Sequence, residues 1–419
     1  MRRLLCASVL GLFAATVLAP GASASQLITW DTPSSFVAPD QIIYNKPPPG
    51  GPDLTPGLRV NVLLPDGYNP KKRYPVLFLL HGHGDRFDYW ANPERGDVID
   101  LAAGQQMIIV MPEGGQGWYA NWWNGGKRAD PAWETYYLQQ LIPLVEKRLP
   151  ILPGRRYHAI AGLSMGGLGA LYLAEQLPGY FGSAASFSGF ISLQRPESVA
   201  GFNTQGQDYN TVFGDPQGFY ATAHNPTAEV DNLGASRLFV RVGDGTPNPS
   251  SPDEVANYFG AIAELELHQQ ANDFVAAAQG AGEDVTYEQT QGIHDWPYWR
   301  AALASALKWG FFNPVPEAPA EWSYRTAATT GNAWGIGYSF SPAPAGIEHL
   351  SLVGGRTLHG DGSGTATLHT PSRCKLTVAM SPRWQLQLPK GWRRTPHGHK
   401  HRKRAKRACK KVKAGAPSF

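Results

Sequence analysis

The sequence predicts an α/β fold with a doubly wound, mostly parallel sheet, followed by a small all-β module. Short apolar runs alternate with longer helical segments over residues 58–312, and this alternation stops at a proline-rich linker over 313–319. Beyond the linker, only short runs of alternating polarity remain. Strands separated by helices require parallel crossovers, and runs that are apolar throughout favour strands buried on both faces.

The expected elements follow in chain order. Strands are expected at 59–64, 76–80, 107–111, 157–161 and 238–242, with a further strand-like run at 284–287. Helices are expected between them at about 134–149, 165–177, 253–280 and 297–309. After the linker, five short strands are expected at 334–340, 348–353, 365–370, 375–380 and 384–388. The predicted organisation is an α/β domain over 58–312 and a linker with a β-rich module over 313–389.

The N-terminus has the composition of an export signal. Arg2 and Arg3 precede an apolar run, and Ala22-Ser23-Ala24 then offers a small-residue cleavage site. The run has about 15 residues, fewer than the roughly 20 that a membrane span needs. Residues 1–24 are therefore predicted to be a removable signal peptide, and no transmembrane span is expected in the mature protein. Residues 25–57 are rich in proline and glycine and carry no helix or strand signal.

Positive charge is concentrated at the C-terminus. Twelve Lys or Arg lie between Lys390 and Lys413, and no Asp or Glu follows Asp361. Without these twelve charges the formal net charge of +4 becomes −8, so the overall charge gives no support for nucleic-acid binding. Residues 390–419 are predicted to be a basic tail that binds an anionic cell-envelope polymer. The expected location is secreted or associated with the cell envelope.

Three cysteines are too few for a disulfide-dense scaffold or a multi-cysteine zinc protein. Cys6 lies within the predicted signal, so Cys374 and Cys409 remain after its removal. An even pair in an oxidising compartment predicts a disulfide between the β module and the tail.

The strongest motif is Gly162-Leu163-Ser164-Met165-Gly166, between an expected strand and an expected helix. A Gly-x-Ser-x-Gly in this position is typical of the nucleophile elbow of α/β hydrolases, where glycines allow a sharp turn and the serine hydroxyl stands at a helix N-terminus. The motif predicts Ser164 as a nucleophile and the backbone N–H of Met165 as an oxyanion donor. The alternative is a glycine-rich turn with an incidental serine.

His294 follows the last expected strand of the α/β domain, which fits the chain order serine, acid, histidine. The loop His81-Gly82-His83-Gly84-Asp85 follows the strand at 76–80, and by position the N–H of His83 is the expected second oxyanion donor. A metal site is the alternative for this loop. However, Arg86 follows instead of another histidine, and no second cluster has ligand spacing, so no metal or cofactor is expected.

A carboxylate must hold the second nitrogen of His294. Asp244, just beyond the strand at 238–242, is the simplest candidate, and Glu264 and Glu266 lie on the next helix.

Together these segments resemble the esterase D superfamily, in particular secreted antigen 85 type mycolyltransferases and related actinobacterial esterases. The resemblance covers roughly residues 58–310 and rests on seven segments: 62–68, 80–85, 117–123, 133–134, 162–167, 243–247 and 294–299. It implies a serine esterase or acyltransferase that forms an acyl-enzyme from a small-molecule or lipid ester. For a transferase, it implies a sugar acceptor such as trehalose.

The resemblance also ranks the candidate residues. It favours Glu264 as the triad acid, with Asp244 and Glu266 as alternatives. Several aromatic residues are candidates to line an acyl or sugar platform, with core packing as the alternative reading. Among them the resemblance favours Trp296, and Trp122 is taken with it as substrate-binding.

The sequence also departs from the mycolyltransferases. Their loop begins Asp-Gly-Leu-Arg, and here His81 and Gly84 replace its Asp and Arg. A trehalose site built from those two residues is therefore not expected, whereas ester hydrolysis requires neither. The alternative of another class is a non-catalytic cell-wall-binding protein on a hydrolase scaffold.

Overall fold

The computed structural model describes residues 24–42, 57–128, 130–395 and 409. Residues 1–23 of the predicted signal peptide and most of the predicted basic tail lie outside these residues.

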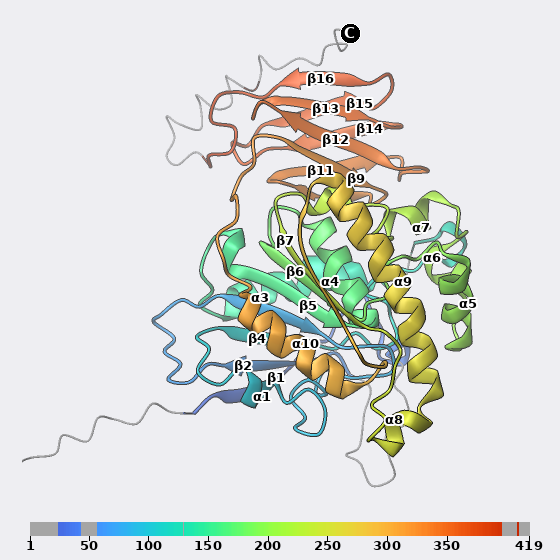
Figure 1. Ribbon diagram of the computed structural model, residues 1–419. Helices are drawn as coiled ribbons and strands as arrows, with labels where there is room; N and C mark the ends of the chain where they lie inside the picture. Colours follow the sequence, from blue (N-terminus) through green and yellow to red (C-terminus); the bar gives the residue numbers. More distant parts are fainter. Residues whose placement is uncertain (1–23, 43–56, 129, 396–408, 410–419) are drawn as a thin grey trace, which may run out of the picture.

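A mostly parallel sheet forms the centre of the α/β domain (Figure 1). Within the described residues it has eight strands in the order β1-β2-β4-β3-β5-β6-β7-β8. Strands β3 to β8 pair in parallel, whereas β1 and β2 are antiparallel to their neighbours. The predicted doubly wound sheet is thereby confirmed. The bounds are β1 Gln26–Asp31, β2 Arg59–Leu64, β3 Val76–Leu80, β4 Ile108–Pro112, β5 His158–Leu163, β6 Ser183–Phe187, β7 Arg237–Gly243 and β8 Asp284–Thr290.

Helices cover both faces of this sheet because successive side chains of a strand point to opposite faces. In β3, Val76 and Phe78 pack into the core under α4 and α9, whereas Leu77 and Leu79 pack into the core under α10. The bounds are α1 Val98–Leu101, α2 Trp133–Thr135, a π-helix Tyr136–Leu141, α3 Ile142–Arg148, α4 Met165–Gln176, α5 Pro196–Thr204, α6 Tyr209–Phe213, α7 Phe219–Ala223, α8 Pro252–Ala256, α9 Tyr258–Ala281 and α10 Trp296–Trp309. In the part of the chain that is described, no helix combines the length and apolar character that crossing a membrane requires.

The proline- and glycine-rich N-terminal segment contains a strand that the sequence did not indicate. Strand β1 pairs antiparallel with β2 at the edge of the sheet. Ile28 and Trp30 pack against the core, while Leu27 and Asp31 are exposed. The alternation is incomplete in the sequence, because the exposed Leu27 is as apolar as its neighbour Ile28.

The β module consists of two four-stranded antiparallel sheets, with strand orders β10-β11-β14-β15 and β16-β13-β12-β9. Its core is formed by side chains from both sheets, among them Tyr324, Ile336, Leu350 and Leu368. Figure 1 shows the module at one end of the α/β domain. The bounds are β9 Trp322–Thr326, β10 Thr330–Ala333, β11 Ile336–Ser341, β12 Glu348–Val353, β13 Thr357–Asp361, β14 Thr365–His369, β15 Lys375–Ala379 and β16 Trp384–Gln387.

Polar contacts hold the module against the α/β domain. The side chain of Asn232 bonds with both the backbone N–H and the carbonyl of Arg325, each at 2.8 Å. The Arg325 guanidinium lies 3.4 Å from the buried carboxylate of Glu229. Arg155 donates to the carbonyl of Pro316 in the linker at 2.9 Å. These contacts fix the position of the module.

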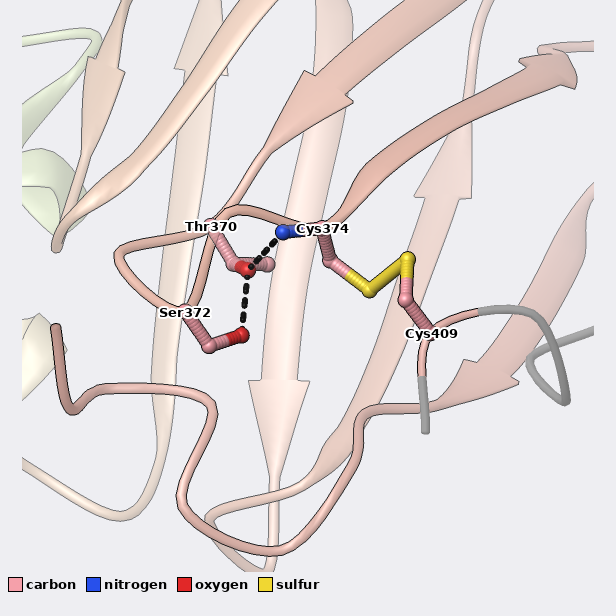
Figure 2. Close-up of a disulfide and its surroundings, with 4 residues drawn as sticks. All are labelled: Thr370, Ser372, Cys374 and Cys409. Carbon is pink, nitrogen blue, oxygen red and sulfur yellow. Dashed lines mark hydrogen bonds between the residues drawn. A yellow bond between two sulfur atoms is a disulfide. The ribbon is translucent and has the colours of Figure 1, made fainter. Parts of the chain in front are cut away.

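A disulfide joins Cys374 to Cys409, with the two Cα atoms 5.4 Å apart (Figure 2). Cys374 lies in the turn between β14 and β15, where its N–H donates to the hydroxyl of Thr370 at 3.2 Å. The Thr370 hydroxyl also lies 2.9 Å from that of Ser372. The disulfide therefore holds one residue of the predicted tail segment against an ordered turn of the module.

Candidate active site

Ser164 lies at the turn between β5 and α4 with φ 52° and ψ −119°. This conformation is rare for a residue with a side chain and indicates a locally strained backbone. The flanking glycines are required by close packing. A Cβ on Gly162 would lie 2.2 Å from the carbonyl oxygen of Gly166, and a Cβ on Gly166 would lie 2.6 Å from that of His81. The turn thus places the Ser164 side chain at the N-terminus of α4.

Ser164, His294 and Glu264 form one continuous hydrogen-bonded chain. Nε2 of His294 lies 2.9 Å from Oγ of Ser164, and Nδ1 lies 2.9 Å from Oε2 of Glu264. Because a carboxylate only accepts hydrogen bonds, Nδ1 carries the proton and Nε2 is left to accept one from the serine hydroxyl. This arrangement can raise the nucleophilicity of the serine.

Glu264 is fully buried on α9, and the hydrogen bonds that it accepts offset the cost of burial. Its second oxygen, Oε1, accepts from the hydroxyl of Ser188 and from the N–H of Gly243, each at 2.6 Å. The backbone N–H of His294 donates to the carbonyl of Gly260 on the same helix at 3.0 Å. Ser188 has no motif around it and was not expected from the sequence.

The two alternative acids do not contact His294. Asp244 is exposed, and its carboxylate accepts from the N–H groups of Thr246 at 2.8 Å and Gly292 at 3.2 Å. It therefore stabilises the loop after β7. Glu266 lies two residues beyond Glu264, and its carboxylate binds Nε of Arg195 at 3.0 Å.

The two expected oxyanion donors belong to two segments that lie close to Ser164. Met165 is the first residue of α4, and His83 lies in the loop after β3. Among the described residues, neither backbone N–H donates a hydrogen bond to another protein group. A Cβ on Gly82, next to His83, would lie 3.4 Å from Cβ of Ser164. The loop therefore passes close to the serine, as an oxyanion site requires.

The His83 side chain also lines the pocket beside Ser164. Its Nε2 lies 3.2 Å from Oε1 of Gln207, and that oxygen also accepts from Nε1–H of Trp118 at 2.6 Å. Burial lowers the pKa of His83 to about 4, although the bond to Gln207 opposes this. The imidazole is thus neutral near pH 7 with its proton on Nε2. No sequence motif indicated Gln207, which lies 124 positions from His83.

The same loop carries the residues of the alternative metal site, His81, His83 and Asp85. The His81 side chain has a different partner from that of His83, because its Nε2 lies 3.0 Å from the buried carboxylate of Glu113. Within the described ranges, no three His, Cys, Asp or Glu side chains are grouped so that they could hold a metal ion.

A pocket of about 990 Å³ opens at Ser164 and His294, between α5 and α9. Much of its lining is apolar: Trp118, Phe190, Phe259, Ile262, Leu265 and Leu267. Phe259 and Ile262 on α9 are also 90% and 67% exposed. The pocket therefore continues outward onto an exposed apolar stripe of this helix.

Trp296 and Trp122, the two tryptophans expected to bind substrate, are not among the residues that line this pocket. Trp296, the first residue of α10, is buried, and its ring centroid lies 5.2 Å from that of Trp90 and 5.4 Å from that of Trp299. Trp122 donates through Nε1 to the carbonyl of Gly117 at 3.2 Å. Trp296 is close to His294 in sequence, but the first turn of α10 points its side chain into the core.

Comparison with known proteins identifies related sequences. The Esterase family, described as "Putative esterase", matches residues 54–309. Esterase Rv1288 of Mycobacterium tuberculosis is 36% identical over 247 residues, covering 56% of this chain and 52% of that protein. The chain thus spans about half the length of this relative. The diacylglycerol acyltransferase/mycolyltransferase Ag85C of Mycobacterium avium is 28% identical over 277 residues, covering 61% of this chain and 78% of that protein.

Two solved structures share the fold. Mycobacterium tuberculosis MPT51 (FbpC1) matches with a TM-score of 0.51 and 22% identity, covering 67% of this chain and 96% of that one. FphF, a fluorophosphonate-binding serine hydrolase of Staphylococcus aureus, matches with a TM-score of 0.52 and 19% identity, covering 70% of this chain and 100% of that one. At these identities the likeness establishes the α/β-hydrolase fold.

Proposed function

The chain belongs to the Esterase family, and from this we propose that it is an exported serine esterase that hydrolyses carboxylic esters through an acyl-enzyme. The observation that carries the proposal is the hydrogen-bonded chain from Ser164 through His294 to Glu264, which begins in the apolar pocket. Ser164 is the proposed nucleophile, His294 the general base and Glu264 the acid that fixes the imidazole tautomer.

The proposed reaction has two halves. Ser164 Oγ attacks the ester carbonyl while His294 Nε2 takes its proton, and the N–H groups of Met165 and His83 stabilise the oxyanion. The imidazolium then gives its proton to the departing alcohol, leaving an acyl-serine. In the second half, His294 takes a proton from water, the water attacks the acyl carbonyl, and the free acid leaves as Ser164 recovers its proton.

The pocket supports an ester with an apolar acyl group. Apolar side chains from α5, α9 and the loop after β6 surround the approach to Ser164, and burial of an alkyl chain against them stabilises the complex by roughly 0.8 kcal/mol per CH₂. Polar side chains, among them His83, Gln205 and Asn257, also line the pocket, and polar groups within a partly apolar cleft are what orient a reacting carbonyl.

Acyl transfer is the second candidate, because the same acyl-enzyme reacts with a sugar hydroxyl in place of water. Sequence similarity to a protein named diacylglycerol acyltransferase/mycolyltransferase favours it. The two outcomes differ in product: with trehalose present, a transferase forms a trehalose ester and an esterase releases free acid. A wall-binding protein without activity is the remaining alternative, and the hydrogen-bonded Ser164–His294–Glu264 chain argues against it.

Export and attachment to the cell envelope belong to the same proposal. The charged and apolar N-terminal sequence supports export. The Cys374–Cys409 disulfide supports an oxidising compartment. The Lys- and Arg-rich sequence after residue 390 supports binding to an anionic polymer of the envelope.

The test is hydrolysis of a short-chain nitrophenyl ester by the purified mature protein and by its Ser164→Ala variant. Turnover by the wild type and its loss in the variant support the esterase. Trapping of a stoichiometric acyl adduct, followed by peptide mass spectrometry, should locate the acyl group on Ser164. Absence of wild-type turnover on both nitrophenyl and acylglycerol esters would favour the non-catalytic alternative.

A further inference from the structure

A second cavity, of about 580 Å³, lies between the α/β domain and the β module. It shares no lining residue with the pocket beside Ser164. The α/β domain contributes side chains that include Glu134, Gln176 and His224, and the module contributes side chains that include Thr330 and Asn332. The cavity is therefore formed only when both parts of the chain are present.

His224 is a buried hydrogen-bond acceptor in this cavity. It is only 4% exposed, and its Nδ1 lies 2.7 Å from the carbonyl oxygen of Tyr220, so Nδ1 carries the proton. Burial lowers the pKa of His224 to about 4, which leaves the imidazole neutral. Nε2 has no hydrogen-bond partner among the described residues. A buried acceptor of this kind favours a ligand that can donate to it.

Glu134 lies beside this nitrogen, with Oε2 4.0 Å from Nε2 of His224. The same oxygen accepts from the hydroxyl of Tyr172 at 2.9 Å. Burial raises the pKa of Glu134 to about 7, so near neutral pH this carboxyl can either donate or accept a hydrogen bond. A hydroxyl group of a ligand can also both donate and accept a hydrogen bond, so it matches the pair formed by His224 and Glu134.

The other polar groups of the cavity are mostly uncharged. Gln176 is 4% exposed and brings a neutral amide to the cavity lining. Thr330 and Asn332 approach from the module. The cation of the lining, Arg128, is already engaged: its guanidinium donates to the carbonyls of Ala327 and Pro344. The cavity therefore disfavours an anion, which would also lie close to Glu134.

Aromatic rings complete the lining. Tyr172, Tyr220 and Tyr338 lie in the cavity wall among the amide, hydroxyl and imidazole groups. Ring faces pack against C–H groups, while the planar polar side chains pair with hydroxyls. The volume falls within the range of about 300–1,000 Å³ that is usual for small-molecule sites.

We propose that this cavity is a binding site for a neutral carbohydrate, separate from the ester site. The proposal stands on the buried acceptor of His224, the adjacent Glu134 and the mostly uncharged lining, and it does not depend on the ester chemistry. Since both domains supply contacts, bound carbohydrate should also stabilise the packing of the module against the α/β domain.

The experiment is isothermal titration of the full-length mature protein with maltose, lactose and trehalose, up to the millimolar range. Gln176→Leu removes the buried amide at similar volume. The double variant Thr330→Val, Asn332→Asp changes the module side and keeps the Asn332 oxygen that accepts from Gly335. Gln279→Leu, at an exposed position of α9 outside both pockets, is the matched control.

At least one disaccharide should bind the wild type and the control equally. Each cavity variant should weaken that binding about tenfold or more, as expected for loss of one or two good hydrogen bonds. Nitrophenyl ester turnover should stay within about twofold in every variant, which also shows that the variants are folded. If Gln176→Leu does not fold, the double variant on the module decides. Absence of binding for all three disaccharides, or binding that both cavity variants leave unchanged, overturns the proposal.

Discussion

Nδ1 of His294 lies 2.9 Å from Oε2 of Glu264, although His294 follows β8 and Glu264 is inside α9. The carboxylate is completely buried, and its other oxygen is held by Ser188 and Gly243. Asp244, the carboxylate nearest to the end of β7 in sequence, faces solvent instead. The carboxylate that is hydrogen-bonded to this imidazole therefore comes from helix α9.

Replacement of Ser164 by alanine is expected to abolish ester turnover without loss of the fold. In a comparable triad, loss of the nucleophile lowers kcat by on the order of a million-fold. Steady-state hydrolysis of a nitrophenyl ester measures the effect, and circular dichroism controls for folding. A folded variant that keeps more than about a tenth of the wild-type rate would contradict the proposed mechanism.

The acid assignment is tested by comparing Glu264→Gln with Asp244→Asn and Glu266→Gln. Glutamine at 264 keeps the shape but removes the negative charge that stabilises the imidazolium, so kcat should fall by on the order of ten-thousand-fold. The other two variants should stay within about tenfold of wild type, because neither carboxylate contacts His294. A dead Asp244→Asn enzyme with an active Glu264→Gln enzyme would reverse the assignment.

Much of the α/β domain was predictable because several of its strands are largely apolar. The expected strands at 59–64 and 76–80 coincide with β2 and β3, and the helix expected at 165–177 matches α4. Strand β6 was missed, since its sequence Ser-Ala-Ala-Ser-Phe consists mainly of small residues. Its burial depends on the neighbouring strands β5 and β7, and no local pattern reports such context.

The β module was predicted less completely. Five strands were expected, and the described part of the module contains eight, including β9, β10 and β13. Strand β10, Thr-Gly-Asn-Ala, has no apolar alternation and depends on pairing with β11. In the candidate site, the motif around Ser164 identified the turn, but the lining of the pocket by α5 and α9 depends on helix packing. The direction of the Trp296 side chain likewise depends on how α10 packs, which its closeness to His294 in sequence does not report.

The apolar stripe of α9 should select for longer acyl chains. Phe259 and Ile262 line the pocket and are exposed, so Phe259→Gln with Ile262→Gln removes apolar surface without disturbing the core. We expect kcat/KM for a long-chain ester to fall roughly tenfold, with little change for an acetyl ester. Tyr258→Gln is the matched control, since Tyr258 is 72% exposed but does not line the pocket. An equal loss on both esters, or an equal effect of the control, would exclude this role.

Glu175 on α4 should make the stability of the fold depend on pH. It is fully buried, neither carboxylate oxygen has a hydrogen-bond partner among the described residues, and burial raises its pKa well above the ordinary value. The folded state thus retains a proton that the unfolded chain loses, so the free energy of unfolding decreases as pH rises above the ordinary glutamate pKa. For one such group the slope approaches about 1.4 kcal/mol per pH unit.

Glu175→Gln removes this proton uptake. The variant should therefore gain thermal stability relative to wild type between pH 5 and pH 8, by a margin that increases with pH. Differential scanning calorimetry at several pH values measures it, with exposed Glu94→Gln as the control. A constant offset between variant and wild type at all pH values would mean that Glu175 carries the same charge in both states.

Attachment to the cell envelope is expected to depend on the basic tail. Trp392 is 2% exposed and donates through Nε1 to the carbonyl of Gly355, so a deletion that starts at residue 390 would damage the module. Deletion of 396–419 instead keeps this contact and removes nine of the twelve positive charges. This deletion is combined with Cys374→Ser, which avoids a free thiol. The resulting protein should be released from envelope fractions, and its turnover of a soluble ester should be unchanged. The full-length protein should need high salt for release, because salt screens exposed charges.

A full-length Cys374→Ser, Cys409→Ser variant separates the charge of the tail from its covalent attachment. By the chain-entropy model, closure of a loop with a sequence separation of 35 stabilises the folded module by roughly 3–4 kcal/mol. This variant should therefore unfold at lower temperature yet still bind the envelope in a salt-sensitive way, because it keeps all twelve charges. If it is released as readily as the truncated protein, the disulfide positions the tail for binding. If the truncated protein fractionates with the envelope as before, the basic tail is not the attachment site.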